Sequence, residues 1–89
     1  MMAKTEFPDV EIFTTPTCPD CRQLKAWLTS KGVPFTERDL TDPAVAEEAK
    51  ARTGVRVAPI TIIGTNVSYG TFASQRPKLA DLLSLPRGA

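Results

Sequence analysis

The sequence predicts a small three-layer α/β fold in which three helices cover a four-stranded mixed sheet, in the order β-α-β-α-β-β-α. Short apolar and β-branched runs alternate with segments of helical character over most of the chain. The helix between the first two strands requires a right-handed parallel crossover. A short turn between the last two strands makes them an antiparallel hairpin of the same sheet.

The first half of the chain contains two of these strands and two of the helices. They are expected, in chain order, over residues 9–14, 19–31, 35–40 and 43–53. The first strand is a β-branched and aromatic run, and both helices carry a proline in their first turn, where its missing N–H costs nothing. Gly32 and Gly54 follow the two helices and end them.

The second half contains the hairpin and the last helix. Residues 60–63 are the most apolar short run of the chain and predict a central strand. A glycine-containing turn leads to an alternating partner strand over 67–69. We expect residues 70–74 to be a loop and Pro77 to start an amphipathic helix that Pro86 ends.

Length and charge restrict the class of protein. The 89 residues suit one domain, with residues 1–8 and 85–89 as ends that we expect to be flexible. Eleven basic and ten acidic residues give a net charge of +1, which offers no electrostatic argument for nucleic acid or an anionic membrane surface. No apolar run approaches the roughly 20 residues needed to cross a bilayer, and the N-terminus lacks the apolar core of a signal peptide. We therefore expect a cytoplasmic protein, and a monomer.

The two cysteines of the chain, Cys18 and Cys21, lie where the first strand meets the first helix, with two residues between them. A thiol pair at this spacing and place is typical of a redox site. A helix start presents unpaired N–H groups and the positive end of the helix dipole, which favour a thiolate, the form that attacks disulfides. We therefore predict Cys18 as the exposed nucleophile and Cys21 as the more buried resolving thiol.

Two other interpretations of the cysteine pair are an inert buried pair and a metal clip. With two cysteines and no histidine, one chain does not complete a four-ligand Cys/His zinc site. We therefore predict no metal site within a single chain and favour disulfide exchange.

These residues carry a family likeness. The cysteine pair opening the first helix, followed by Ala58-Pro59 before an apolar strand, resembles the thioredoxin superfamily. The short layout is similar to its glutaredoxin branch, and Cys-Pro-Asp-Cys is close to the Cys-Pro-Tyr-Cys of dithiol glutaredoxins. The resemblance covers about residues 9–84, and it implies a thioredoxin-like fold of the glutaredoxin type. Asp20 is an unusual middle residue, and we expect its carboxylate to counter the neighbouring thiolate.

The resemblance also implies where a partner or glutathione binds. Pro59 would have a cis peptide bond and lie across from the thiols, and the backbone of Ala58 would offer strand-type hydrogen bonds to an extended substrate segment. The predicted binding residues fall in three segments. These are Thr17, Pro19 and Asp20; then Arg56, Val57, Ala58 and Pro59; then Tyr69, Gly70, Thr71 and Phe72.

The electron donor is open between glutathione and thioredoxin reductase. Glutaredoxins usually carry acidic residues after the hairpin and a lysine three residues before the first cysteine. This chain has no Asp or Glu from 65 to 80, and Thr15 stands at the lysine position. The segment from Tyr69 to Phe72, followed by Arg76, is similar to NrdH-redoxins, which carry electrons from thioredoxin reductase to ribonucleotide reductase.

The sequence thus predicts a thiol–disulfide carrier for protein disulfides, with no bound cofactor and with glutathione as a co-substrate in one alternative. Two further alternatives are a non-catalytic scaffold that holds an iron–sulfur cluster between two chains, and a regulatory disulfide sensor without turnover.

Overall fold

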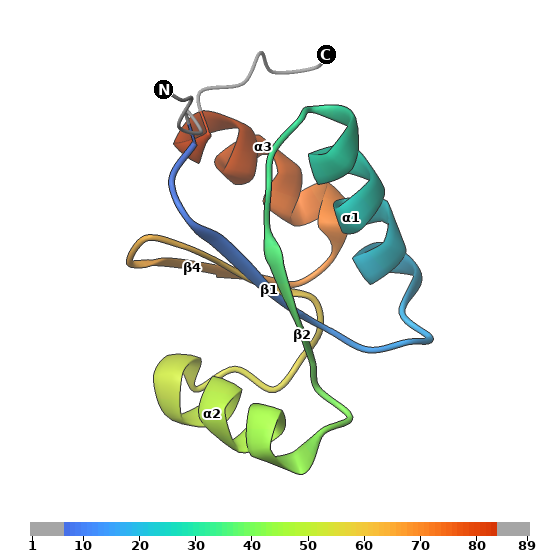
Figure 1. The fold of residues 1–89 in the computed structure, drawn as a ribbon, viewed down its shortest axis with the longest axis vertical. Helices are drawn as coiled ribbons and strands as arrows, with labels where there is room; N and C mark the ends of the chain where they lie inside the picture. Colours follow the sequence, from blue (N-terminus) through green and yellow to red (C-terminus); the bar gives the residue numbers. More distant parts are fainter. Residues whose placement is uncertain (1–6, 84–89) are drawn as a thin grey trace.

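The computed structural model describes residues 7–83, and its elements follow the predicted order (Figure 1). They are β1 (Val10–Thr14), α1 (Pro19–Ser30), β2 (Thr36–Asp39), α2 (Pro43–Thr53), β3 (Ile60–Ile63), β4 (Asn66–Tyr69) and α3 (Phe72–Leu82). The terminal segments 1–6 and 84–89, including Pro86, lie outside the described residues. Within 7–83, no helix is long and apolar enough to cross a membrane.

The four strands form one mixed sheet in the order β2-β1-β3-β4. The β1–β2 pair is parallel, as the crossover through α1 requires, and the other two pairs are antiparallel. Phe13 of β1 pairs with Ile60 of β3. The segment that leaves β1 and the segment that enters β3 therefore lie side by side at the same end of the strands.

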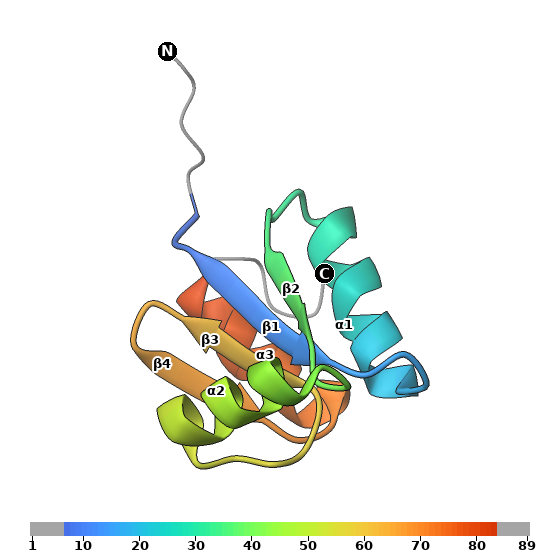
Figure 2. The same cartoon turned by 60° about the horizontal axis from the view of Figure 1, so that its bottom comes forward.

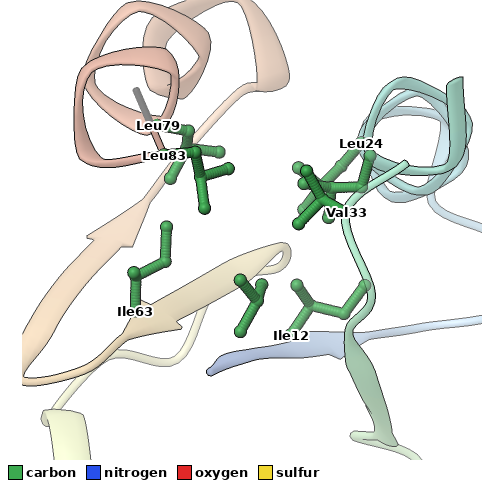
Figure 3. Packing of buried hydrophobic residues seen from close by; sticks show 8 residues of the cluster. Ile12, Leu24, Val33, Ile63, Leu79 and Leu83 are labelled. Atoms are coloured by element: carbon green, nitrogen blue, oxygen red, sulfur yellow. The ribbon is translucent and has the colours of Figure 1, made fainter. Parts of the chain in front are cut away.

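Helices cover both faces of the sheet, with α1 and α3 on one face and α2 on the other (Figures 1 and 2). The core cluster under α1 and α3 consists of Val10, Ile12, Leu24, Leu28, Val33, Ile63, Leu79 and Leu83. Figure 3 shows the α1 and α3 side chains of this cluster converging over Ile12 and Ile63. The cluster under α2 consists of Phe13, Ala49, Ile60 and Ile62. Alternate strand residues thus enter opposite layers, as the period of a strand dictates.

The start of the last helix was predicted wrongly, because α3 begins at Phe72 rather than at Pro77. Thr71 caps it, and the Thr71 hydroxyl oxygen accepts the Ser74 N–H at 3.1 Å. Pro77 lies inside the helix, where it removes the bond to the carbonyl of Ala73, an exposed residue that water can reach. The threonine cap therefore outweighs the proline as the start signal.

An ionic cluster joins α2 to the strands β1 and β2. Arg38 lies 2.8 Å from Glu11 and 2.6 Å from Glu48. Arg52 lies 3.0 Å from each of these two carboxylates. Both guanidinium groups lie over the Phe13 ring, 5.7 and 5.8 Å from its centroid. The cluster covers the outer edge of the core layer under α2.

This cluster is expected to make stability depend on pH. Hydrogen bonds with Arg52 and Arg38 hold the pKa of Glu11 below its ordinary value of 4.5. Because the folded-state pKa is the lower one, the stabilisation is present above the ordinary value and is lost as the pH falls through the folded-state pKa. From about pH 5 to pH 3, urea unfolding should show a steeper loss of unfolding free energy for wild type than for Glu11→Gln.

Glu47→Gln is the matched control, since Glu47 is an exposed residue of α2 outside the cluster. It should keep the wild-type pH slope. Identical slopes in wild type and Glu11→Gln would show that the cluster does not couple protonation to folding.

Candidate active site

Cys18 and Cys21 occupy the start of α1. Cys18 is the N-cap residue, and its sulfur accepts the Cys21 N–H at 3.1 Å. Pro19 follows at the first helical position, where a proline fits without loss of a hydrogen bond. Cys18 is half-buried, whereas Cys21 is only 1% exposed. The helix start thus presents one accessible sulfur that receives a backbone N–H, with the second thiol beneath it.

The environment of Cys21 favours its protonated form. Burial, together with a hydrogen bond to Cys18, raises the pKa of the Cys21 thiol from 9.0 to about 12. The backbone of Thr15 and the charge of Lys25 act in the opposite direction but do not cancel the rise. Cys21 is therefore a neutral thiol in the reduced protein at neutral pH.

Alkylation should separate the two thiols. In the folded, reduced protein at pH 7, iodoacetamide is expected to modify Cys21 at least about 100-fold more slowly than in urea, because burial removes both access and the thiolate form. Peptide mass spectrometry on timed samples measures the rate at each cysteine. Cys18 is expected to react first. Equal rates at the two sites in the folded protein would contradict this arrangement.

Asp20 connects the cysteine motif to α3. Its Oδ1 accepts the Phe72 N–H at 3.0 Å, across 52 positions of sequence. A carboxylate is favourable at this place, because the N-terminus of a helix carries unpaired N–H groups and positive charge. Trp27 of α1 meets the Phe72 ring in an edge contact, with centroids 5.8 Å apart. Helix α1 therefore holds the start of α3 through a backbone hydrogen bond and a ring contact, a role of Asp20 that the sequence did not indicate.

This contact predicts different behaviour for two Asp20 variants. Asp20→Ala removes the acceptor and should lower the unfolding free energy by about 1 kcal/mol, whereas Asp20→Asn keeps an oxygen for the Phe72 N–H and should lose less. Urea unfolding measures the loss. Hydrogen exchange at the Phe72 amide reports the contact itself and should accelerate in Asp20→Ala more than in Asp20→Asn. Unchanged exchange at the Phe72 amide in Asp20→Ala would show that the hydrogen bond to Asp20 does not protect it.

The Ala58–Pro59 peptide bond is cis, as the resemblance implied. Pro59 is buried and directly precedes β3, so the β1–β3 pairing brings it beside the segment that leads to the cysteines. A groove of about 540 Å³ opens next to it, between Ala58, Thr15 and one side of α2. Arg56 also lines this groove, and among residues 7–83 its guanidinium has no ion-pair partner.

The third predicted binding segment follows β4. Tyr69 is 58% exposed, and Val57 on the second segment is 51% exposed. In the described part of the chain, these two are the large apolar side chains that face solvent. Thr17, Pro19 and Thr71 are also exposed, whereas Phe72 is half-buried against the core cluster under α1 and α3.

Gln75 is a residue of this region that sequence reasoning missed. Its side chain is buried, 3% exposed, and its Nε2 donates to the carbonyl oxygens of Pro59 and Gly70, each at 2.9 Å. Its Oε1 accepts the Thr61 hydroxyl at 2.8 Å. The structure thereby joins the second and third predicted segments through one carboxamide. A glutamine between a predicted loop and a predicted helix gives no signal of burial.

Comparisons with known proteins agree with this architecture. The glutaredoxin family model matches residues 10–67. The thioredoxin-like protein BC3987 is 29% identical, with a TM-score of 0.76 over 83% of this chain and 99% of that chain. The glutaredoxin-like protein NrdH-redoxin from Escherichia coli is 26% identical, with a TM-score of 0.67 over 82% of this chain and 91% of that chain.

A curated relative is longer than this chain. The global transcriptional regulator Spx of Staphylococcus aureus is 34% identical over 79 residues, which cover 86% of this chain and 56% of Spx. The chain thus spans about half the length of the curated relatives that it matches. The family model covers more than half of the chain, and the strand order and the cis-proline agree with it. The chain therefore belongs to the glutaredoxin family of the thioredoxin superfamily.

Proposed function

We propose that this protein is a small electron carrier that reduces protein disulfides through Cys18 and Cys21 and is reset by thioredoxin reductase rather than by glutathione. The observation that carries the proposal is the asymmetry of the two thiols. The accessible sulfur caps a helix and accepts an N–H, whereas the buried thiol beneath it is held protonated. The proposal includes a cytoplasmic location, because thiol pairs in reducing compartments are typically catalytic. It also includes a monomeric state.

The reaction transfers two electrons in two exchange steps. The Cys18 thiolate attacks a substrate disulfide, forming a mixed disulfide and releasing one substrate thiolate, which takes up a proton. Cys21 then loses its proton and attacks the Cys18 sulfur. This step releases the second substrate thiolate and leaves a disulfide between Cys18 and Cys21. The reductase returns two electrons to that disulfide.

The timing of the second step follows from what raises the pKa of Cys21. Burial is the largest cause of that rise, and the hydrogen bond and the charge of Cys18 add to it. Both contributions end when Cys18 enters the mixed disulfide, because its sulfur is then neutral and bonded to the substrate. Ionisation of Cys21 therefore becomes easier at the stage where its attack is needed.

Three features support thioredoxin reductase as the donor. The chain is similar to NrdH-redoxin from Escherichia coli, a glutaredoxin-like protein with a thioredoxin-like activity profile. Residues 65–80 contain no carboxylate that would meet the amino group of glutathione. The Phe72 N–H at the start of α3 already donates to Asp20, so it is not open to a carboxylate of glutathione. Glutathione is the alternative donor, and Arg56, which lines the groove and has no ion-pair partner among residues 7–83, would offer a cation to its carboxylate or to an acidic patch of a protein partner.

The donor is tested by NADPH consumption with oxidised insulin as the disulfide substrate, and with ribonucleotide reductase as the partner that the sequence resemblance implies. One arm contains thioredoxin reductase, and the other contains glutathione with glutathione reductase. We expect turnover in the first arm only, with Cys18→Ser inactive. Cys21→Ser should accumulate a mixed disulfide with the substrate, visible by non-reducing electrophoresis, because no thiol resolves it.

Other outcomes lead to the alternatives. Turnover only with glutathione would make the protein a glutathione-dependent glutaredoxin. With no turnover in either arm, a visible absorbance band after anaerobic purification with iron and sulfide would indicate a cluster scaffold between two chains. Reversible oxidation without turnover or cluster would favour a sensor, the alternative that the similarity to the transcriptional regulator Spx supports.

A further inference from the structure

The Gln75 carboxamide is a fully used hydrogen-bonding group in the interior. Both of its N–H groups and its oxygen have partners between 2.8 and 2.9 Å. A buried amide with every polar atom satisfied is rigid, because any rotation would leave donors or acceptors unpaired in a dry environment. Gln75 therefore fixes the distances between its partners.

Two of these partners belong to the segments on which the proposed substrate contacts lie. The Pro59 carbonyl immediately precedes β3, and Val57 lies two residues before it. The Gly70 carbonyl lies between β4 and α3, directly after Tyr69. The exposed apolar side chains of Val57 and Tyr69 thus sit on the two backbone segments that one side chain connects.

The third partner anchors the amide in the sheet. Thr61 is a residue of β3, 1% exposed, and its hydroxyl donates to the Gln75 oxygen. The backbone at Gly70 is also constrained, with a φ of +105° that favours glycine and little space for a Cβ, which would lie 3.2 Å from the Ser74 hydroxyl oxygen. The segment after β4 therefore takes a single path, and Gln75 ties that path to Pro59.

The same turn of α3 also reaches the cysteine motif. Phe72, three residues before Gln75, donates its N–H to Asp20, which lies between the two cysteines. The first turn of α3 thus contacts all three predicted binding segments, through Asp20 on one side and through Gln75 on the other. Within residues 7–83, the hydrogen bonds of the Gln75 side chain go to Thr61, Pro59 and Gly70 and to neither cysteine, so its influence on the reacting sulfur is indirect.

We propose that Gln75 is a positioning residue that holds the Pro59 and Gly70 segments at a fixed spacing beside Cys18, and that this spacing sets the affinity for protein disulfide substrates. The inference rests on the proposed function. Because the two backbone segments already have a fixed spacing, substrate binding does not have to order them, and the entropy cost of binding is smaller. A small disulfide reaches Cys18 without contacting these segments, so its reaction does not depend on their spacing.

The test compares Gln75→Met, which preserves side-chain size but removes both donors, with Thr61→Val, which removes the third bond of the same amide and leaves both donors. Pre-reduced protein is mixed with excess oxidised insulin, and the single-turnover rate is followed against insulin concentration. The half-saturating concentration is expected to rise about 5- to 10-fold in Gln75→Met and less than about twofold in Thr61→Val, with the limiting rate within about twofold of wild type in both.

A second readout separates positioning from general damage. The second-order rate of Cys18 with a small aromatic disulfide should stay within about twofold of wild type in Gln75→Met. Gln75→Met removes the hydrogen-bond partner of two carbonyl oxygens and the Thr61 hydroxyl, whereas Thr61→Val removes only the partner of the Gln75 oxygen. The unfolding temperatures of both variants are therefore measured, so that loss of stability is separated from loss of affinity. An unchanged half-saturating concentration in Gln75→Met, or an equal rise in Thr61→Val, would overturn the proposal, as would a parallel loss of the small-disulfide rate.

The experiment also distinguishes the two proposals. Pre-reduced protein supplies its own electrons, so the assay does not depend on which reductase resets it. A wild-type protein that fails to reduce insulin under these conditions would overturn the carrier function and, with it, the role of Gln75. If wild type and Gln75→Met reduce insulin equally well, the carrier function stands and the positioning role of Gln75 is removed.

Discussion

The antiparallel pairing of β1 with β3 is the constraint on which the site depends. These strands form the centre of the sheet, and Ile12, Phe13 and Ile60 are completely buried there. Ile12 packs under α1 and α3, whereas Phe13 packs under α2. A register shift of one residue would exchange these side chains between the layers, so the pairing is strongly specified by both cores at once. The cysteines follow β1 and Pro59 precedes β3. The same pairing therefore places the cysteine segment beside the backbone that enters β3.

Sheet pairing alone does not complete the site, because the segment after β4 leaves from the far side of β3. The first turn of α3 makes the remaining connections. The Phe72 N–H in this turn donates to the Asp20 carboxylate of the cysteine motif. The Gln75 carboxamide in the same turn bonds Thr61 of β3 and the carbonyl of Pro59. Both contacts use polar atoms that would be costly to leave unpaired, so the helix start is held by hydrogen-bond satisfaction as much as by apolar packing. The core cluster beneath α3, with Leu79 and Leu83, holds the other end of the helix.

The elements that the sequence predicted well are those set by local rules. Apolar alternation, first-turn prolines and the glycines after the first two helices placed these helices and all four strands within one or two residues of their observed bounds. The start of α3 was misplaced because Thr71 and Pro77 are competing start signals, and the choice between them depends on contacts with Asp20 and Trp27, which are distant in sequence. Gln75 could not be found for the same reason. Its burial depends on three partners, and a single glutamine carries no pattern that reveals them. The cysteine pair was found because its spacing and its strand–helix position are both local.

Placing one thiol above another at a helix start has a chemical consequence for the order of events. A thiol that is buried and protonated does not compete for incoming disulfides, so in the proposed reaction the first attack falls to Cys18. Burial is the main cause that keeps Cys21 protonated, and the sulfur that Cys21 would attack in the proposed reaction adds to it through its hydrogen bond and charge. Formation of the proposed mixed disulfide would remove the contributions of Cys18 and make ionisation of Cys21 easier. The Cys18 N-cap geometry, in which the Cys21 N–H donates to the Cys18 sulfur, places the two residues in contact. In the proposed reaction, the burial of Cys21 and its contacts with Cys18 together set the order of the two exchange steps.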